Sequence, residues 1–164
     1  EELGQLRKEN RAVLLLSSDI YTPAGLVRLG QAFPLMNSWV TKPEEAAKIS
    51  HSFYEGGSID IEMFHDSPYR TRQGYNEQQL REKIAADGRI GMRLPTYLVG
   101  SQFSELLTGH YFDENTWSRT PESFCGGRAL SAGFLSGGAL GVNGWDPGYQ
   151  YPYLGGRSEG VKRA

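Results

Sequence analysis

The chain has 164 residues and a formal net charge of −2, from 17 basic and 19 acidic residues that are well mixed along the sequence. This balance argues against a nucleic-acid-binding surface and against a polybasic contact with a membrane. The longest apolar run, residues 12–16, is far shorter than the roughly 20 residues that cross a bilayer. We therefore expect one soluble domain over residues 1–164, with no membrane insertion and no nucleic-acid partner.

The first residues predict a charged helical arm over residues 1–10, followed by a short apolar strand over residues 12–16. Because the chain opens on Glu1 without Met or a signal-peptide pattern, we expect a processed or trimmed product. Thr22 followed by Pro23 is typical of a helix start. That helix should continue through Leu26, Leu29 and Phe33.

A second helix is expected from Thr41 to about Phe53, because Thr41 and Glu44 have the spacing of a capping box. Residues 58–64 then alternate apolar side chains with Asp60 and Glu62, which predicts a half-buried strand whose acidic face is solvated.

Further along, Asn76 with Gln79 predicts a helix that ends at Asp87-Gly88. Residues 89–94 alternate again and are expected to form a strand. A helix should begin at Thr96 or Ser101 and end at Gly109, and its apolar positions are Phe103, Leu106 and Leu107.

From Trp117 onward the sequence predicts only strands and loops. Of the 21 glycines, 11 lie between Gly126 and Gly160, and they alternate with aromatic residues that flexible linkers seldom carry. Short alternating segments separated by glycine pairs are typical of small antiparallel sheets with tight turns and long Gly-rich loops. Since helices come early and strands late, the predicted class is α+β.

Several segments of residues 89–164 occur in the order found in one known family. They are Arg93-Leu94-Pro95-Thr96, Phe103–Leu107, Thr116–Thr120, Gly127–Ala132, Gly155-Gly156-Arg157 and Gly160–Arg163. This part of the chain resembles the formylglycine-generating-enzyme and sulfatase-modifying-factor family, including related bacterial and phage modules. The resemblance implies a C-type-lectin-like half over 89–164, which follows a helix-rich half over 11–88.

The same resemblance implies a scaffold that displays variable loops on short strands. Such modules serve in binding, including on bacterial surfaces and in phage receptor-binding or virion proteins. The copper-dependent enzymes of the family work through a pair of cysteines. Cys125 is the one cysteine of this chain, so that activity is not carried over, and neither a disulfide nor a thiolate metal cluster can form within the chain.

Other candidate chemistry is sparse, and we predict no catalytic residue, no metal and no cofactor. A nucleophilic Cys125 would need a histidine beside it, and His110 is the nearest in sequence. The pair His65-Asp66, with Asp60 and Glu62 before it, is the most metal-like cluster, but a solvated sheet face explains it better. Residues 143–148 lack the triplets of calcium-binding lectin loops, so calcium-dependent sugar binding is not implied.

The remaining functional candidate is an aromatic cluster near the end of the chain. Its candidate ligand-binding residues are Asn143, Trp145, Asp146, Tyr149, Tyr151 and Tyr153. The tyrosines alternate, which would place them on one face of an extended segment, either exposed for recognition or buried as core. We predict a non-enzymatic module that binds a protein or glycan ligand through loops around residues 136–155.

Two alternatives remain open. In the first, the chain is a structural subunit of a virion or other assembly, and the aromatic side chains form contacts within a homo-oligomer. In the second, the chain is an enzyme that uses His65, Asp66 or Cys125.

Overall fold

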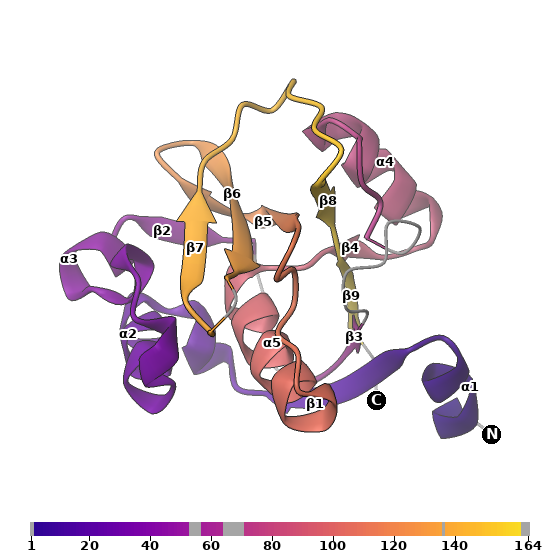
Figure 1. Cartoon of the computed structure of the whole chain (residues 1–164), viewed down its shortest axis with the longest axis horizontal. Coiled ribbons are helices and arrows are strands. Elements are labelled where there is room, and N and C mark those ends of the chain that lie inside the picture. Colours follow the sequence, from indigo (N-terminus) through magenta and orange to yellow (C-terminus); the bar gives the residue numbers. More distant parts are fainter. Residues whose placement is uncertain (1, 53–56, 64–70, 136, 162–164) are drawn as a thin grey trace.

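Figure 1 shows the computed structural model of the chain, which describes residues 2–52, 57–63, 71–135 and 137–161. The class is α+β, as expected. The helices are α1 (Glu2–Lys8), α2 (Pro23–Ala32), α3 (Pro43–Ala46), α4 (Glu77–Ala86) and α5 (Leu94–Thr108), with short 3-10 helices at Ser18–Tyr21, Pro34–Met36 and Trp39–Thr41. None of the described helices is both long and apolar enough to cross a bilayer.

The strands form two sheets, and each sheet combines strands from both halves of the chain. Sheet one has the order β1-β3-β9-β4 and is antiparallel throughout. Sheet two has the order β2-β5-β6-β7, with β8 joined parallel to β5. The strands are β1 (Arg11–Leu16), β2 (Ile49–His51), β3 (Gly57–Glu62), β4 (Ile90–Gly91), β5 (Trp117–Cys125), β6 (Arg128–Phe134), β7 (Leu140–Asn143), β8 (Leu154–Gly156) and β9 (Ser158–Val161).

Glycine pairs make the turns of sheet two, as the sequence predicts. Gly126 and Gly127 have φ angles of 59° and 79° and join β5 to β6, where Cys125 pairs with Arg128. Two consecutive residues with positive φ are the requirement of the two-residue type I′ hairpin. Gly137 and Gly138, with φ angles of 93° and 86°, lie in the connection from β6 to β7.

Local capping signals set most of the helix ends. The Thr22 hydroxyl accepts from the N–H of Gly25 at the start of α2. Asn76 and Gln79 bond reciprocally at the start of α4, as a capping box does. Gly109 has a left-handed φ of 78° and ends α5, as expected.

Three expectations for local structure are wrong. The helix expected from Thr41 to about Phe53 is only the short α3, because residues 49–51 instead pair with β5 as strand β2; Phe53 lies outside the described residues. The strand expected over 89–94 is limited to the two residues of β4. Helix α5 begins at Leu94, before both expected starts, because Pro95 fits the first turn of a helix, and the Thr96 hydroxyl bonds to Tyr21.

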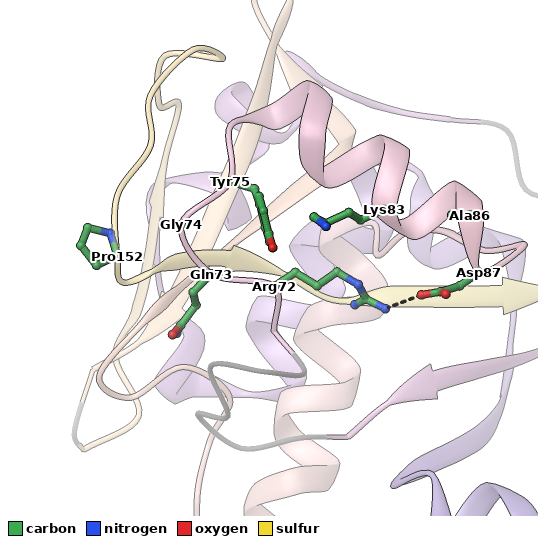
Figure 2. A pocket seen from close by; sticks show the side chains of 8 residues that line it. All are labelled: Arg72, Gln73, Gly74, Tyr75, Lys83, Ala86, Asp87 and Pro152. Carbon is green, nitrogen blue, oxygen red and sulfur yellow. Dashed lines mark hydrogen bonds and ion pairs between the residues drawn. The ribbon is translucent and has the colours of Figure 1, made fainter.

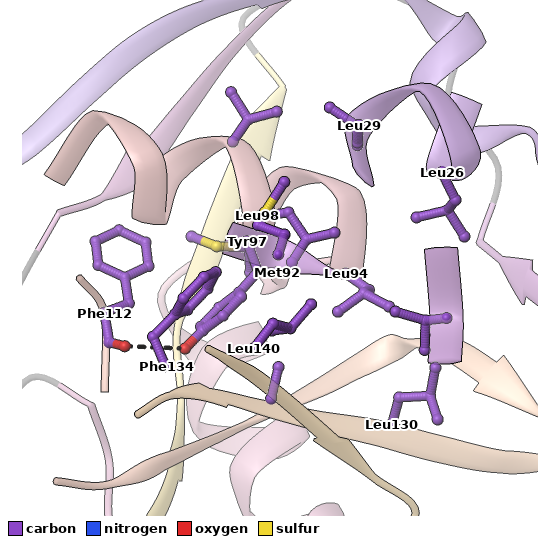
Figure 3. Close-up of a cluster of buried hydrophobic side chains, with 14 of the residues drawn as sticks. Leu26, Leu29, Met92, Leu94, Tyr97, Leu98, Phe112, Leu130, Phe134 and Leu140 are labelled. Atoms are coloured by element: carbon purple, nitrogen blue, oxygen red, sulfur yellow. Dashed lines mark hydrogen bonds between the residues drawn. The ribbon is translucent and has the colours of Figure 1, made fainter. Parts of the chain in front are cut away.

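The hydrophobic core lies between α5 and the two sheets (Figure 3). Tyr97 of α5 stacks on Phe134 of β6, with ring centroids 6.0 Å apart, and contacts Phe112 edge-on at 5.5 Å. Gly100 allows α5 to approach sheet one closely, since a Cβ there would lie 2.8 Å from a methyl carbon of Ile61. The core therefore fixes the two sheets against one central helix.

Buried ion pairs cross the same region. Arg157 and Asp113 are both fully buried and lie 3.1 Å apart, and Asp113 also accepts from the hydroxyls of Tyr97, Thr116 and Ser118. Burial alone would raise the pKa of Asp113, but Arg157 and the hydroxyl donors outweigh it and hold that pKa below its usual range. Arg93 and Glu159 form a second fully buried pair, which joins the start of α5 to β9.

The acidic face of β3 differs from the expectation of a solvated surface. Asp60 is 8% exposed and Glu62 is 6% exposed. Arg11 and Arg89 contact Asp60, and Arg72 donates to both oxygens of Glu62 at 2.8 Å. The two carboxylates are therefore covered by arginines that come from distant parts of the sequence.

Candidate functional site: the aromatic platform

The six predicted ligand-binding residues lie together on the connection between β7 and β8. Asn143 ends β7, and the other five lie in residues 144–153, which we call the platform loop. In Figure 1 this loop, in yellow, arches beyond the ends of β6 and β7 and descends beside α4 to β8. Residues 146–149 form a turn, in which the N–H of Tyr149 donates to the carbonyl of Asp146.

The four aromatic side chains of the loop form one continuous cluster, which we call the aromatic platform. The rings of Trp145, Tyr149 and Tyr151 are tilted by 22° to 31° relative to one another, and their centroids are 5.6 to 6.0 Å apart. Tyr153 contacts Tyr151 edge-on at 5.5 Å. Both arrangements are favourable for aromatic pairs, so the rings hold one another in place.

The platform is exposed at its two ends and half-buried between them. Tyr149 is 45% exposed and Tyr153 is 55% exposed, whereas Trp145 and Tyr151 are half-buried. Asn143, Asp146 and Gln150 are exposed around the rings and supply both hydrogen-bond donors and acceptors. This answers the question that the alternation alone left open: the tyrosines are neither fully buried core nor isolated on the surface.

Trp117 supports the platform from β5. Its ring meets that of Trp145 edge-on, with centroids 6.1 Å apart. It also lies against β7, because a Cβ on Gly141 would be 2.7 Å from the Trp117 ring. The half-buried ring of Trp117 therefore packs beneath the platform.

Arg119 fixes the backbone of the platform loop. Its guanidinium group is 1% exposed and donates from Nη2 to the carbonyl oxygens of Asp146, at 3.1 Å, and Tyr149, at 2.8 Å. Burial lowers the pKa of Arg119, although Glu77 and Asp146 act in the opposite direction. The N-terminal turn of α4 adds a second anchor, since the N–H of Glu77 donates to the carbonyl of Pro147.

Several buried polar atoms around this loop make no hydrogen bond within the described structure. They are Nε and Nη1 of Arg119, Oε2 of Glu77, Nε1 of Trp145 and Nε2 of Gln73. Buried polar atoms usually have a partner, which is often an ordered water. This concentration of polar atoms distinguishes the base of the platform loop from the apolar core.

Two grooves border the platform loop on either side of the start of α4. The larger, of about 850 Å³, is shown in Figure 2 and is lined by Arg72, Gln73, Gly74, Tyr75, Lys83, Ala86, Asp87 and Pro152. In it the ammonium group of Lys83 lies 4.4 Å from the ring centroid of Tyr75. The smaller groove, of about 520 Å³, includes Pro147 and Gly148 of the loop. Both volumes are in the range of ligand-binding clefts.

Of the candidate catalytic residues, the structure describes Cys125 and His110. His65 and Asp66 lie outside the described residues. Cys125 is half-buried at the end of β5, while His110 is bonded to Glu114 on the loop after α5. Within the described part of the chain, no three His, Cys, Asp or Glu side chains are grouped to hold a metal ion.

One histidine that the sequence analysis did not single out has a distinct environment. Nδ1 of His51 lies 2.7 Å from Oγ of Ser123, which also accepts the N–H of Leu94. Burial, assisted by the charge of Arg93, lowers the pKa of His51 to about 4. Ser123 is fully buried, so this pair links β2 to β5 and offers no accessible nucleophile.

Searches against protein-family models, curated proteins and solved structures found no match to this chain.

Proposed function

We propose that the chain is a non-enzymatic binding module that presents the aromatic platform to a protein or glycan ligand. One observation carries this proposal: four aromatic side chains form a mutually packed, partly exposed cluster on a loop that Arg119 and α4 hold in place. Rigid amphipathic rings lose little side-chain entropy on binding, and for this reason they dominate recognition surfaces.

The chemistry around the rings favours a glycan over a protein. Sugar rings combine an apolar C–H face with a rim of hydroxyl groups. The exposed rings of Tyr149 and Tyr153 match such a face, and Asn143, Asp146 and Gln150 match such a rim. The grooves that border the platform would hold further units of a chain of sugars.

We also propose that residues 89–164 adopt a C-type-lectin-like arrangement related to the formylglycine-generating-enzyme family. Two features support this. The Arg93-Leu94-Pro95-Thr96 segment lies where β4 leads into α5, and Arg93 pairs with Glu159 on the last strand. A buried ion pair therefore joins the first of the resembling segments to the last strand, at Glu159 between the two final segments. The chain has one cysteine and so lacks the cysteine pair of the copper-dependent enzymes. The resemblance therefore supports a scaffold for binding.

Affinity electrophoresis with neutral cello-, chito- and manno-oligosaccharide polymers tests the binding proposal. We expect the wild-type chain to be retarded by at least one of them. Tyr149→Ala and Tyr153→Ala should each weaken that binding by about tenfold or more, because each removes an exposed ring. Trp145→Ala should do so as well, because the ring of Trp145 packs against three others.

Leu35→Ala is the matched control, because Leu35 is 59% exposed and lies outside the platform. It should leave the affinity unchanged. Unchanged affinity of the tyrosine variants, with intact folding by circular dichroism, would refute the platform as the binding site. If none of the polymers retards the wild-type chain, the proposal of a glycan ligand is refuted.

A further inference from the structure

Strand β1 forms one edge of sheet one. Within the described residues its strand partner is β3, and no other strand pairs with it. The pairing runs in continuous register from Arg11 opposite Glu62 to Leu16 opposite Gly57. Natural sheets usually protect such an edge with a proline, a lysine or a bulge. β1 has none of these along Arg11–Leu16.

The hydrogen-bond pattern shows which backbone groups of β1 point away from β3. The N–H of Met63 donates to the carbonyl of Asn10 at 2.9 Å, so these two residues are a hydrogen-bonded pair. In antiparallel strands such pairs alternate along the ladder. The N–H and C=O groups of Arg11, Val13 and Leu15 therefore point outward at the edge.

The same residues carry exposed apolar side chains. Leu15 is 81% exposed and Val13 is 36% exposed, whereas Leu14 between them is buried against the core. Arg11, at the start of the strand, is already paired with Asp60 and Glu9. The charge of Arg11 is therefore compensated within its own chain, and it does not repel another strand at this edge.

We propose that two copies of the chain associate through β1, with the strands antiparallel about a twofold axis at Val13. In this register Val13 faces the partner's Val13, Arg11 faces the partner's Leu15, and Leu15 faces the partner's Arg11. Each of these three residue pairs forms two main-chain hydrogen bonds, giving about six in all. This inference goes beyond the proposed binding function and involves none of the platform residues.

A second copy fits this edge because the register is self-complementary. The residues with outward backbone groups meet the same set of residues, and the apolar side chains of both copies fall on one face of the extended sheet. The aliphatic stem of Arg11 covers the partner's Leu15. The two Arg11 charges are kept about four residues, or roughly 13 Å, apart along the strand. A dimer also carries two platforms, which raises its avidity for a repeating ligand.

The mass in solution, measured by sedimentation velocity over a range of concentrations, tests this proposal. The wild type should be a dimer in equilibrium with monomer. Leu15→Lys should raise the dissociation constant by at least about tenfold, because it places a cation opposite the partner's Arg11. Leu35→Lys, at an exposed leucine away from β1, should leave the dimer intact.

Oxidative cross-linking tests the register in a Cys125→Ser background, which removes the native thiol. Val13→Cys should form a disulfide-linked dimer, because facing residues of a hydrogen-bonded pair have Cα atoms about 5.5 Å apart. Leu15→Cys should not, because its counterpart lies about four residues away along the strand. A monomeric wild type, a dimer that survives Leu15→Lys, or equal cross-linking at both positions would overturn the proposal.

Discussion

Acidification should destabilise the protein through His51 in particular. In the folded chain the pKa of His51 is lowered to about 4, first by burial and then by the charge of Arg93. In the unfolded chain it returns to about 6.5. Because the unfolded chain binds the proton more readily, the stability contributed by neutral His51 is fully present above about pH 6.5. It is lost progressively as the pH falls toward about 4.

The size of this effect follows from the two pKa values. Between about pH 7 and about pH 5, protonation of His51 in the unfolded chain lowers the free energy of unfolding by about 2 kcal/mol. The lowered pKa values of Asp113 and Glu62 act mainly below about pH 5, because in the unfolded chain these carboxylates take up protons mainly near pH 4. Burial raises the pKa of Glu159, which acts in the opposite direction, but a comparison of the wild type with a variant that lacks His51 cancels this contribution and isolates the histidine.

Urea unfolding of the wild type and of His51→Asn at both pH values measures this contribution. Asparagine retains a polar atom for the Ser123 hydroxyl but does not titrate. We expect the wild type to lose about 2 kcal/mol more than the variant between about pH 7 and about pH 5. Parallel pH dependence of wild type and His51→Asn would refute the reasoning.

Four further substitutions test the structure. Asp113→Ala leaves Arg157 buried without its carboxylate and should lower the free energy of unfolding by about 3 to 5 kcal/mol in urea titrations. Gly155→Ala places a Cβ 2.0 Å from a backbone oxygen and should cost about 3 kcal/mol. Gly144→Ala, with no atom closer than 3.9 Å, should change the same quantity by less than about 0.5 kcal/mol. Arg119→Met should speed proteolytic cleavage within residues 144–153 by about tenfold, as followed by mass spectrometry, because the loop loses two hydrogen bonds.

The features that the sequence predicted well depend on contacts within a few residues. Thr22 and Asn76 cap their helices through atoms three residues away. The glycine pair at 126–127 supplies the positive φ angles that its hairpin needs. Such signals are local, so they can be read without knowledge of the fold.

The wrong predictions share a different cause. Ile49 has a helical spacing in the sequence, but it forms a strand because Cys125, on a distant segment, pairs with it. Asp60 and Glu62 alternate as a solvated face would, but arginines from other elements cover them. Tertiary partners far along the chain decided both outcomes, and no local pattern reports such partners.

The candidate site was predicted in part. Alternation of the tyrosines indicated that they would gather, and their rings do contact one another. The supporting residues Trp117 and Arg119 lie on β5, far from the loop in sequence, and only the pairing of β5 with β8 brings them beneath it. A buried arginine that donates to loop carbonyl groups has no sequence signal of its own.

The most direct test of the binding proposal is a titration followed by two-dimensional amide NMR. The wild-type chain is titrated with the oligosaccharide whose polymer retards it most in electrophoresis. Our account predicts that the amide signals that shift belong mainly to residues 143–153, together with the amides of Trp117 and Arg119 beneath them. Shifts concentrated on other elements, with the signals of residues 143–153 unmoved, would contradict it.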